Sequence, residues 1–101
     1  MASLQLHILL SWQSDHRVHV KTSPFTIGRH HVNDLRIESD PQVSRRHAQL
    51  VCEDETWYVV DLDSHWGTYL NEKRVDRAVV RSGDRLRIGA RELQLVVGSI
   101  A

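Results

Sequence analysis

Residues 47–62 have the sequence HAQLVCEDETWYVVDL. Apolar and polar side chains alternate along 47–52 and again along 56–62, and the acidic residues 53–55 separate the two runs. Alternation with a period of two, interrupted by a polar turn, is typical of a β-hairpin with one buried face. This stretch predicts strands for the middle of the chain.

The same pattern continues on both sides of this hairpin. Residues 4–10 and 16–20 predict an opening hairpin, 25–27, 35–37 and 69–70 predict short strands, and 86–88 with 92–97 predict a closing hairpin. Trp12 and Trp57 are expected in the core or at its margin. Because helical periodicity is scarce, we expect an all-β fold: a two-sheet antiparallel β-sandwich of about ten to eleven short strands, with its loops gathered at the ends.

Length and charge limit the function. A chain of 101 residues suits one compact domain, which we expect to span residues 1–101. Thirteen Lys and Arg residues balance thirteen Asp and Glu residues, so we expect neither nucleic acid nor a membrane as a partner. All the basic residues except Lys21 and Lys73 are arginines, whose planar guanidinium suits bidentate contact with phosphate.

The cysteine and histidine residues bear on compartment and cofactors. Cys52 is the one cysteine, the start of the chain does not resemble a signal peptide, and the apolar runs are short, so we expect a cytoplasmic protein, or a nuclear one if eukaryotic. The seven histidines lack the spacing of metal sites, and His30 and His31 would point apart in an extended chain. We therefore expect no metal and no cofactor.

Three polar segments lie between the predicted strands: GRHH at 28–31, SRRH at 44–47 and SHWGT at 64–68. If these segments meet at one end of the sandwich, they bring guanidinium, hydroxyl and imidazole groups together. Those groups bind phosphate through charge-assisted hydrogen bonds. Their spacing alone does not decide whether they meet.

The order of these segments resembles the forkhead-associated (FHA) family. GR at 28–29, SRRHA at 44–48 and DLDSHWGTYLN at 61–71 are similar to the family's Gly-Arg, its Ser-x-x-His, and its late Gly-Thr before an aromatic residue, an aliphatic residue and Asn. The resemblance covers nearly the whole chain. It implies an FHA/SMAD-like sandwich with binding loops at about 28–34, 38–47 and 63–68, and a phosphothreonine-dependent protein–protein interaction module in kinase signalling or regulated assembly.

The resemblance also implies roles for individual residues. Arg29 and Ser44 are expected to bind the phosphate directly, with Arg45 beside it, and a small pocket for the threonine methyl group is expected to favour phosphothreonine over phosphoserine. The residues expected to shape the loops without touching the ligand are Gly28, His47, Gly67, Thr68 and Asn71.

Two neighbouring residues complete the expected phosphopeptide site. His65 stands where some members present a small polar group to phosphate, so we expect its imidazole to contact phosphate and to bind better when protonated. Trp66 stands where many members carry an Asn that holds the peptide backbone, and an indole has one donor and no acceptor. Trp66 is therefore expected to pack over the peptide or to alter its selectivity.

Two other functional classes stay open. Ser44, His47 and Asp61 could form a catalytic triad, but the chain has no nucleophile elbow, so we do not expect an enzyme. The sandwich could also serve as a phosphate-independent interaction or oligomerisation module, with Trp66 as a hot spot. The expected partner is a Thr-phosphorylated protein segment, and the chain is expected to be part of a larger polypeptide.

Overall fold

The computed structural model describes residues 3–9 and 16–98, and this part of the chain contains eleven strands and no helix. The strands are β1 (Ser3–Leu9), β2 (His16–Val20), β3 (Phe25–Gly28), β4 (Leu35–Arg36), β5 (Ala48–Glu53), β6 (Thr56–Asp61), β7 (Thr68–Leu70), β8 (Lys73–Val75), β9 (Arg77–Val79), β10 (Arg85–Ile88) and β11 (Arg91–Gly98).

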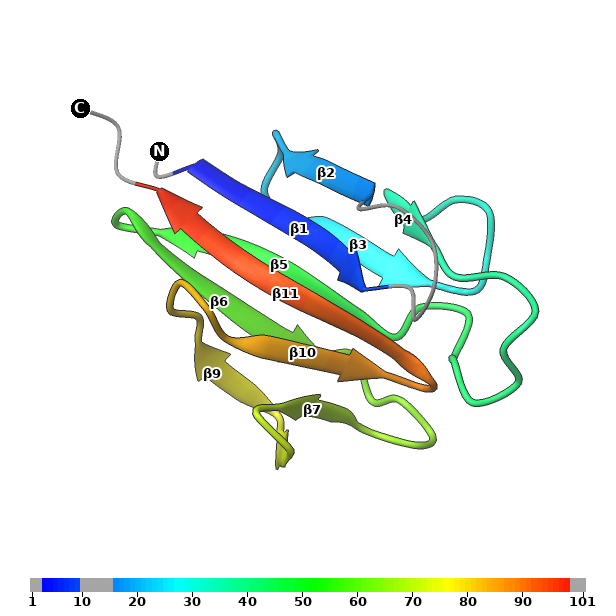
Figure 1. Ribbon diagram of the computed structural model, residues 1–101. Helices are drawn as coiled ribbons and strands as arrows, with labels where there is room; N and C mark the ends of the chain where they lie inside the picture. Colours follow the sequence, from blue (N-terminus) through cyan, green and yellow to red (C-terminus); the bar gives the residue numbers. More distant parts are fainter. Residues whose placement is uncertain (1–2, 10–15, 99–101) are drawn as a thin grey trace.

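The strands form two sheets that face each other (Figure 1). One sheet has the order β2-β1-β11-β10-β7-β8, and the other has the order β4-β3-β5-β6-β9. The predicted all-β sandwich is confirmed. One pair differs from the predicted antiparallel arrangement: β4 runs parallel to β3, with Ile27 opposite Leu35.

Alternate residues of the strands fill the space between the sheets, as a period of two requires. Ala48 and Leu50 of β5 are fully buried, and so are Trp57 and Val59 of β6. Trp57 is therefore a core residue, as expected; Trp12 and the side chains of residues 5–10 lie outside the described part. The rest of the fully buried apolar centre comes mainly from Ile27, Leu86, Ile88, Leu93 and Leu95.

All three predicted hairpins are confirmed by antiparallel pairing: β1 with β2, β5 with β6, and β10 with β11. The central turn is shorter than predicted, because Glu53 pairs with Thr56 and leaves only Asp54 and Glu55 between the strands. Both turn residues have positive φ, 50° and 63°. A two-residue hairpin turn of this kind normally contains glycine, and its absence explains the predicted three-residue turn.

The prediction missed two strands, β8 and β9. The turn between β7 and β8 is made by Asn71 and Glu72, again at positive φ and again without glycine. Both missed strands have three residues and are largely exposed, so their side chains show no alternation of apolar and polar types. A sequence pattern cannot identify such short, solvated strands.

Four of the connections lie together at one end of the sandwich (Figure 1). They are the β3–β4 loop (29–34), the β4–β5 loop (37–47), the β6–β7 loop (62–67) and the turn between β10 and β11. The first residue of β1 and the last residue of β11, Ser3 and Gly98, pair at the opposite end. Among the described residues there is no helix long and apolar enough to cross a membrane.

Candidate functional site

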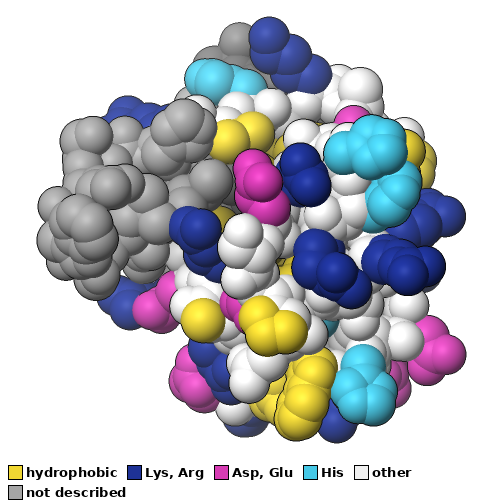
Figure 2. Space-filling model, turned by 90° about the vertical axis from the view of Figure 1, so that its right-hand side faces the viewer, with side chains coloured by type: hydrophobic (Ala, Val, Ile, Leu, Met, Phe, Trp, Pro, Cys, Tyr) yellow, Lys and Arg dark blue, Asp and Glu magenta, His cyan; other side chains and the backbone are white. Residues whose placement is uncertain are grey.

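The β3–β4 and β4–β5 loops are joined by backbone hydrogen bonds. The N–H of Arg29 donates to the carbonyl of Ser44 at 3.0 Å, and the N–H of His30 donates to the carbonyl of Arg45 at 3.1 Å. These bonds fix two of the three polar segments side by side. Figure 2 views this end of the molecule and shows Lys and Arg side chains gathered on it, with His side chains nearby.

Gly28 is required by the closeness of these two loops. A Cβ atom on Gly28 would overlap the carbonyl oxygen of Arg45 and would lie 2.8 Å from Nδ2 of Asn33. Asn33 is buried, and its Nδ2 donates to the carbonyls of both His30 and Arg45 at 2.7 Å. The backbone needs a residue without a side chain here because of close approach, and not because of positive φ.

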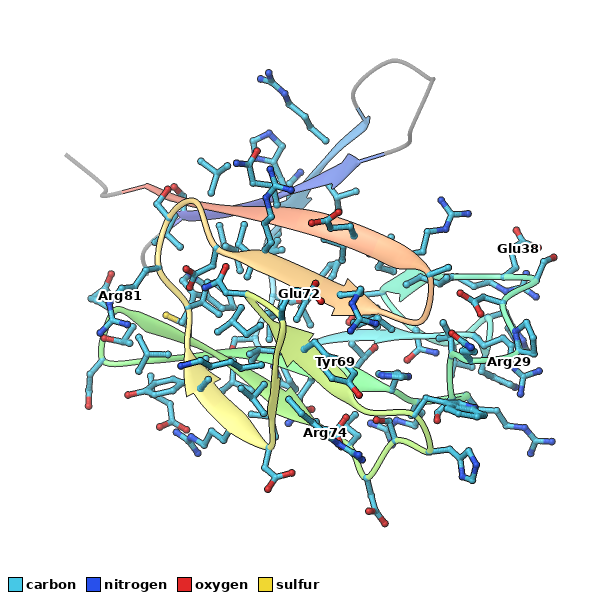
Figure 3. All side chains as sticks on the ribbon, turned by 60° about the horizontal axis from the view of Figure 1, so that its bottom comes forward. Arg29, Glu38, Tyr69, Glu72, Arg74 and Arg81 are labelled. Carbon is cyan, nitrogen blue, oxygen red and sulfur yellow. The ribbon has the colours of Figure 1, made fainter. Side chains whose placement is uncertain are left out.

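Arg29 is exposed and partly held by the protein. Its Nε donates to the carbonyl of Val43 at 3.0 Å, while its own carbonyl accepts a bond from Nε of Arg36 at 3.1 Å. A guanidinium anchored through Nε keeps its two terminal nitrogens available as a parallel pair of donors. Figure 3 shows Arg29 at the loop end, far from Arg81 at the other end of the molecule.

Ser44 lies where all three loops meet. Its hydroxyl oxygen accepts the backbone N–H of His65 at 3.1 Å, which brings the β6–β7 loop against the β4–β5 loop. A hydroxyl that accepts one bond in this way still has its own hydrogen to donate. Ser44 is partly exposed, so that donor can face a ligand.

His47 is fully buried beneath the site and connects the β4–β5 loop to the β6–β7 loop. Its Nδ1 accepts the backbone N–H of Ser44 at 3.1 Å, and its Nε2 lies 2.8 Å from the carbonyl of Gly67. Because Nδ1 is an acceptor, Nε2 carries the hydrogen and donates to Gly67. Both ring nitrogens therefore bond to backbone.

Asp61, at the end of β6, organises the β6–β7 loop. Its carboxylate accepts hydrogen bonds from the N–H and hydroxyl of Ser64 and from the hydroxyl of Thr68. Burial raises the pKa of this carboxyl, but the bonds from Ser64 and Thr68 outweigh burial and hold the pKa below its usual range. The sequence prediction considered Asp61 only as a triad member and missed this role.

Gly67 ends the loop at a φ of 91°, which favours glycine. Its N–H donates to the hydroxyl of Ser64 at 3.0 Å. A Cβ atom on Gly67 would also lie 2.8 Å from Nε of Arg74.

Asn71 shapes a different loop: its side chain forms hydrogen bonds with Asp84 and Arg85 and holds the β7–β8 turn against the start of β10.

Asp40 fastens the other side of the site. Its Oδ2 accepts the N–H of Ala90, in the turn between β10 and β11, and its Oδ1 accepts the N–H of Gln42, both at 2.9 Å. The bond from Ala90 is the main reason why the pKa of Asp40 is lowered. A hollow of about 380 Å³ lies between this residue and Arg29, lined by Arg29, Arg36, Glu38, Ser39, Asp40 and Pro41. The sequence prediction missed this anchor.

The remaining polar groups at this end are exposed. Arg45 and Arg46 are exposed, and within the described part of the chain neither guanidinium has a hydrogen-bond or ion-pair partner. The His30 and His31 rings lie 4.3 Å apart because the chain turns at these residues, so the divergence that an extended chain would impose does not apply. No group of three or more His, Cys, Asp or Glu residues that could hold a metal occurs among the described residues.

Comparison with known proteins identifies the family. The model of the FHA domain matches residues 25–89, which include all three loops. The chain belongs to the FHA family. Its fold agrees, since the FHA domain of FhaA, solved in complex with the intracellular domain of Rv3910, superposes with a TM-score of 0.82 at 27% identity, over 92% of this chain and 99% of that one.

Other relatives of this FHA domain are longer proteins. Glycogen accumulation regulator GarA of Mycobacterium tuberculosis is 42% identical over 71 residues, which are 70% of this chain and 43% of GarA. The oxoglutarate dehydrogenase inhibitor of Corynebacterium glutamicum is 37% identical over 73 residues, 72% of this chain and 50% of that protein. The chain thus spans about half the length of the curated relatives it matches.

Another similar structure contains a ligand of the expected kind. Mycobacterium tuberculosis EmbR, solved in complex with a low-affinity phosphopeptide, superposes on this FHA domain with a TM-score of 0.88 at 26% identity. The match covers 99% of this chain and 26% of EmbR.

Proposed function

We propose that this FHA domain binds a phosphothreonine-containing segment of a partner protein at Arg29, Ser44 and Arg45. The observation that carries the proposal is the meeting of three loops at Ser44, whose carbonyl accepts the N–H of Arg29 and whose hydroxyl accepts the N–H of His65. The comparison with EmbR supports it, because a phosphopeptide is bound in that structure.

The chemistry of the three side chains fits a phosphate monoester. Such a group carries a charge of about −1.5 to −2 at neutral pH and presents three acceptor oxygens. The two terminal nitrogens of Arg29 and the hydroxyl of Ser44 are donors, and Arg45 supplies a second positive charge that has no carboxylate partner in the described part. The two guanidinium charges balance the phosphate charge, so the site needs no metal ion.

Hydrogen bonds to His47 support binding rather than catalysis. A Ser-His-Asp triad needs an imidazole nitrogen that takes the proton of the serine hydroxyl. Both nitrogens of His47 bond to backbone atoms, of Ser44 and Gly67, and Asp61 bonds Ser64 and Thr68 instead of His47. These contacts keep His47 and Asp61 in structural roles and leave the Ser44 hydroxyl without a general base, so we infer a binding module that is not an enzyme.

The cellular setting follows from this proposal. We infer that the domain spans most of the chain and serves a longer signalling protein in the cytoplasm, where a threonine kinase creates its ligand. The names of two relatives, a glycogen accumulation regulator and an oxoglutarate dehydrogenase inhibitor, support a regulatory role.

The test is a titration of a phosphothreonine peptide library, with phosphoserine and unphosphorylated twins, against the wild-type domain and Arg29→Ala. The wild type is expected to bind only phosphorylated peptides and to prefer phosphothreonine. Loss of the charge-assisted bonds of Arg29 should weaken binding by about 10- to 100-fold, which corresponds to roughly 1.5–3 kcal/mol.

Arg81→Ala is the matched control, because Arg81 is exposed at the opposite end of the molecule (Figure 3). It should bind like the wild type. Equal affinity for phosphorylated and unphosphorylated peptides, unaffected by Arg29→Ala, would refute the proposal and favour the phosphate-independent interaction module.

A further inference from the structure

Trp66 is an exposed indole on a rigid loop. Its exposed fraction is 53%, although the residues on either side of it are tightly held. On one side the backbone N–H of His65 donates to Ser44, and on the other the carbonyl of Gly67 accepts a bond from His47. The backbone around Trp66 is therefore ordered before any ligand arrives, so little conformational entropy is lost when the indole makes a contact.

The indole is also supported by a neighbouring ring. The His65 and Trp66 rings meet edge to face, with centroids 5.3 Å apart and an interplanar angle of 82°. The exposed part of the indole is a large apolar surface that the described part of the chain leaves uncovered. Exposed aromatic residues on a rigid support are the type that most often dominates binding energy at protein interfaces.

Trp66 lies next to the proposed phosphate site. The backbone of His65 contacts the Ser44 hydroxyl, and Trp66 is the following residue. A segment anchored at Ser44 by its phosphate therefore brings side chains of its own neighbouring residues to the indole. The occupant of this surface is a side chain of the same phosphorylated segment, and not a separate partner.

The positive charge at the loop end of the sandwich bears on which type of peptide side chain can contact Trp66. Arg45 and Arg46 are exposed without a carboxylate partner in the described part, and Arg29 is at the same end. Once the phosphate balances the charges of Arg29 and Arg45, the exposed guanidinium of Arg46 remains, and it opposes a Lys or Arg side chain of the peptide and its cation–π contact with the indole. An acidic or amide side chain would lose hydration against the apolar ring. An uncharged apolar side chain gains from the contact without either cost.

We propose that Trp66, backed by His65, determines specificity: it binds an apolar side chain such as Leu, Ile, Met or Phe close to the phosphothreonine. This inference rests on the proposed function and deepens it. The phosphate supplies the anchor at Ser44, and the apolar contact at Trp66 distinguishes one phosphorylated sequence from another.

The test uses a phosphothreonine peptide whose flanking residues are all alanine, and a series in which one Leu replaces Ala at successive positions on both sides. Affinities are measured by isothermal titration for the wild type, Trp66→Ala, Trp66→Phe and Val79→Ala. At one position Leu should improve wild-type binding about 5- to 20-fold. Trp66→Ala should abolish this preference, and Trp66→Phe should retain most of it.

Val79→Ala is the control for general loss of apolar surface. Val79 is also exposed, but it lies in β9 opposite Tyr58. This variant should keep the full preference for Leu.

A second readout uses acrylamide quenching of Trp66 fluorescence in a Trp12→Phe background, where the remaining Trp57 is fully buried. The preferred Leu peptide should protect Trp66 more than the all-alanine peptide does.

The outcomes separate the two proposals. Equal binding of every Leu peptide and the all-alanine phosphopeptide to the wild type would overturn the role of Trp66, and so would a Leu preference that persists in Trp66→Ala. The proposed function would stand in both cases as long as the all-alanine peptide binds only when phosphorylated. Binding that ignores phosphate would refute the proposed function and, with it, an occupant anchored at Ser44.

Discussion

The imidazole of His47 bonds the backbone of two loops at once: Nδ1 accepts the N–H of Ser44 at 3.1 Å, and Nε2 donates to the carbonyl of Gly67 at 2.8 Å. Ser44 and Gly67 belong to loops that are separated by two whole strands, β5 and β6. A single buried ring therefore sets the relative position of the β4–β5 and β6–β7 loops.

Substitution of His47 should damage binding without removing a ligand contact. His47→Ala leaves a buried cavity and two unsatisfied backbone groups, so we expect a loss of about 2–4 kcal/mol in the free energy of unfolding. Phosphopeptide affinity should fall with it, because Ser44 loses its fixed position. Chemical denaturation and titration measure both effects. His19→Ala is the control, since His19 is exposed on β2, and it should change neither.

Two glycine substitutions should have different effects. Gly28→Ala places a methyl group against the carbonyl of Arg45, so the β3–β4 and β4–β5 loops must separate, and we expect both stability and phosphopeptide binding to fall. In Gly83→Ala the new methyl group has open space around it, so the only cost is the backbone strain of a non-glycine residue at a φ of 93°. It should cost about 1 kcal/mol in stability and leave affinity unchanged. A Gly28→Ala variant that binds normally would contradict the required close approach.

The acid stability of the domain should depend on Asp61. Its pKa is lowered in the folded state, so its ionised form contributes stability above the unfolded value of about 3.9, and that contribution is lost as pH falls through the lower folded pKa. Urea denaturation from pH 7 to pH 2.5 should show a drop below about pH 4. Asp61→Asn should be less stable at pH 7 and should show a smaller drop. An unchanged acid profile in this variant would exclude Asp61 as the cause.

Asp40 should hold the β4–β5 loop in place through its hydrogen bond with the turn between β10 and β11. Asp40→Ala removes the bonds to Ala90 and Gln42, and we expect a loss of about 1–2 kcal/mol in stability. Amide hydrogen exchange at Ala90 and Gln42 should speed up in this variant. Glu38→Ala is the matched control: Glu38 also lines the hollow, but its contact with Arg36 is an exposed ion pair at 3.6 Å, which contributes little.

The contribution of the His65 side chain can be separated from that of its backbone. The structure shows the backbone N–H of His65 on the Ser44 hydroxyl and the imidazole against Trp66. If the imidazole also contacts phosphate, His65→Ala should bind the phosphopeptide more weakly than the wild type does, and His65→Gln, which keeps a side-chain donor, should retain part of the affinity. Equal affinities of the wild type and both variants would remove the imidazole from the site and leave only the backbone contact.

The sequence predicted most of the fold because strand and hairpin signals are local. The hairpin at β5 and β6 is visible from alternation over a few residues and an acidic turn. The signal failed at the β7–β8 turn, where Asn71 and Glu72 adopt positive φ without glycine, and at the short exposed strands β8 and β9. It also could not show that β4 runs parallel to β3, since strand direction depends on the path of the connecting loop.

The sequence by itself determined the strand segments, the residue types of the three polar loops and the family to which the chain belongs, because each depends on the order of nearby residues. Only the tertiary structure decided that the loops meet and that the Ser44 hydroxyl accepts the N–H of a residue 21 positions away. It also decided that the carboxylates of Asp61 and Asp40 fix the β6–β7 and β4–β5 loops by hydrogen bonds to Ser64 and Ala90. Those contacts join residues that are distant in the chain, and packing of the two sheets, rather than any local pattern, brings them together.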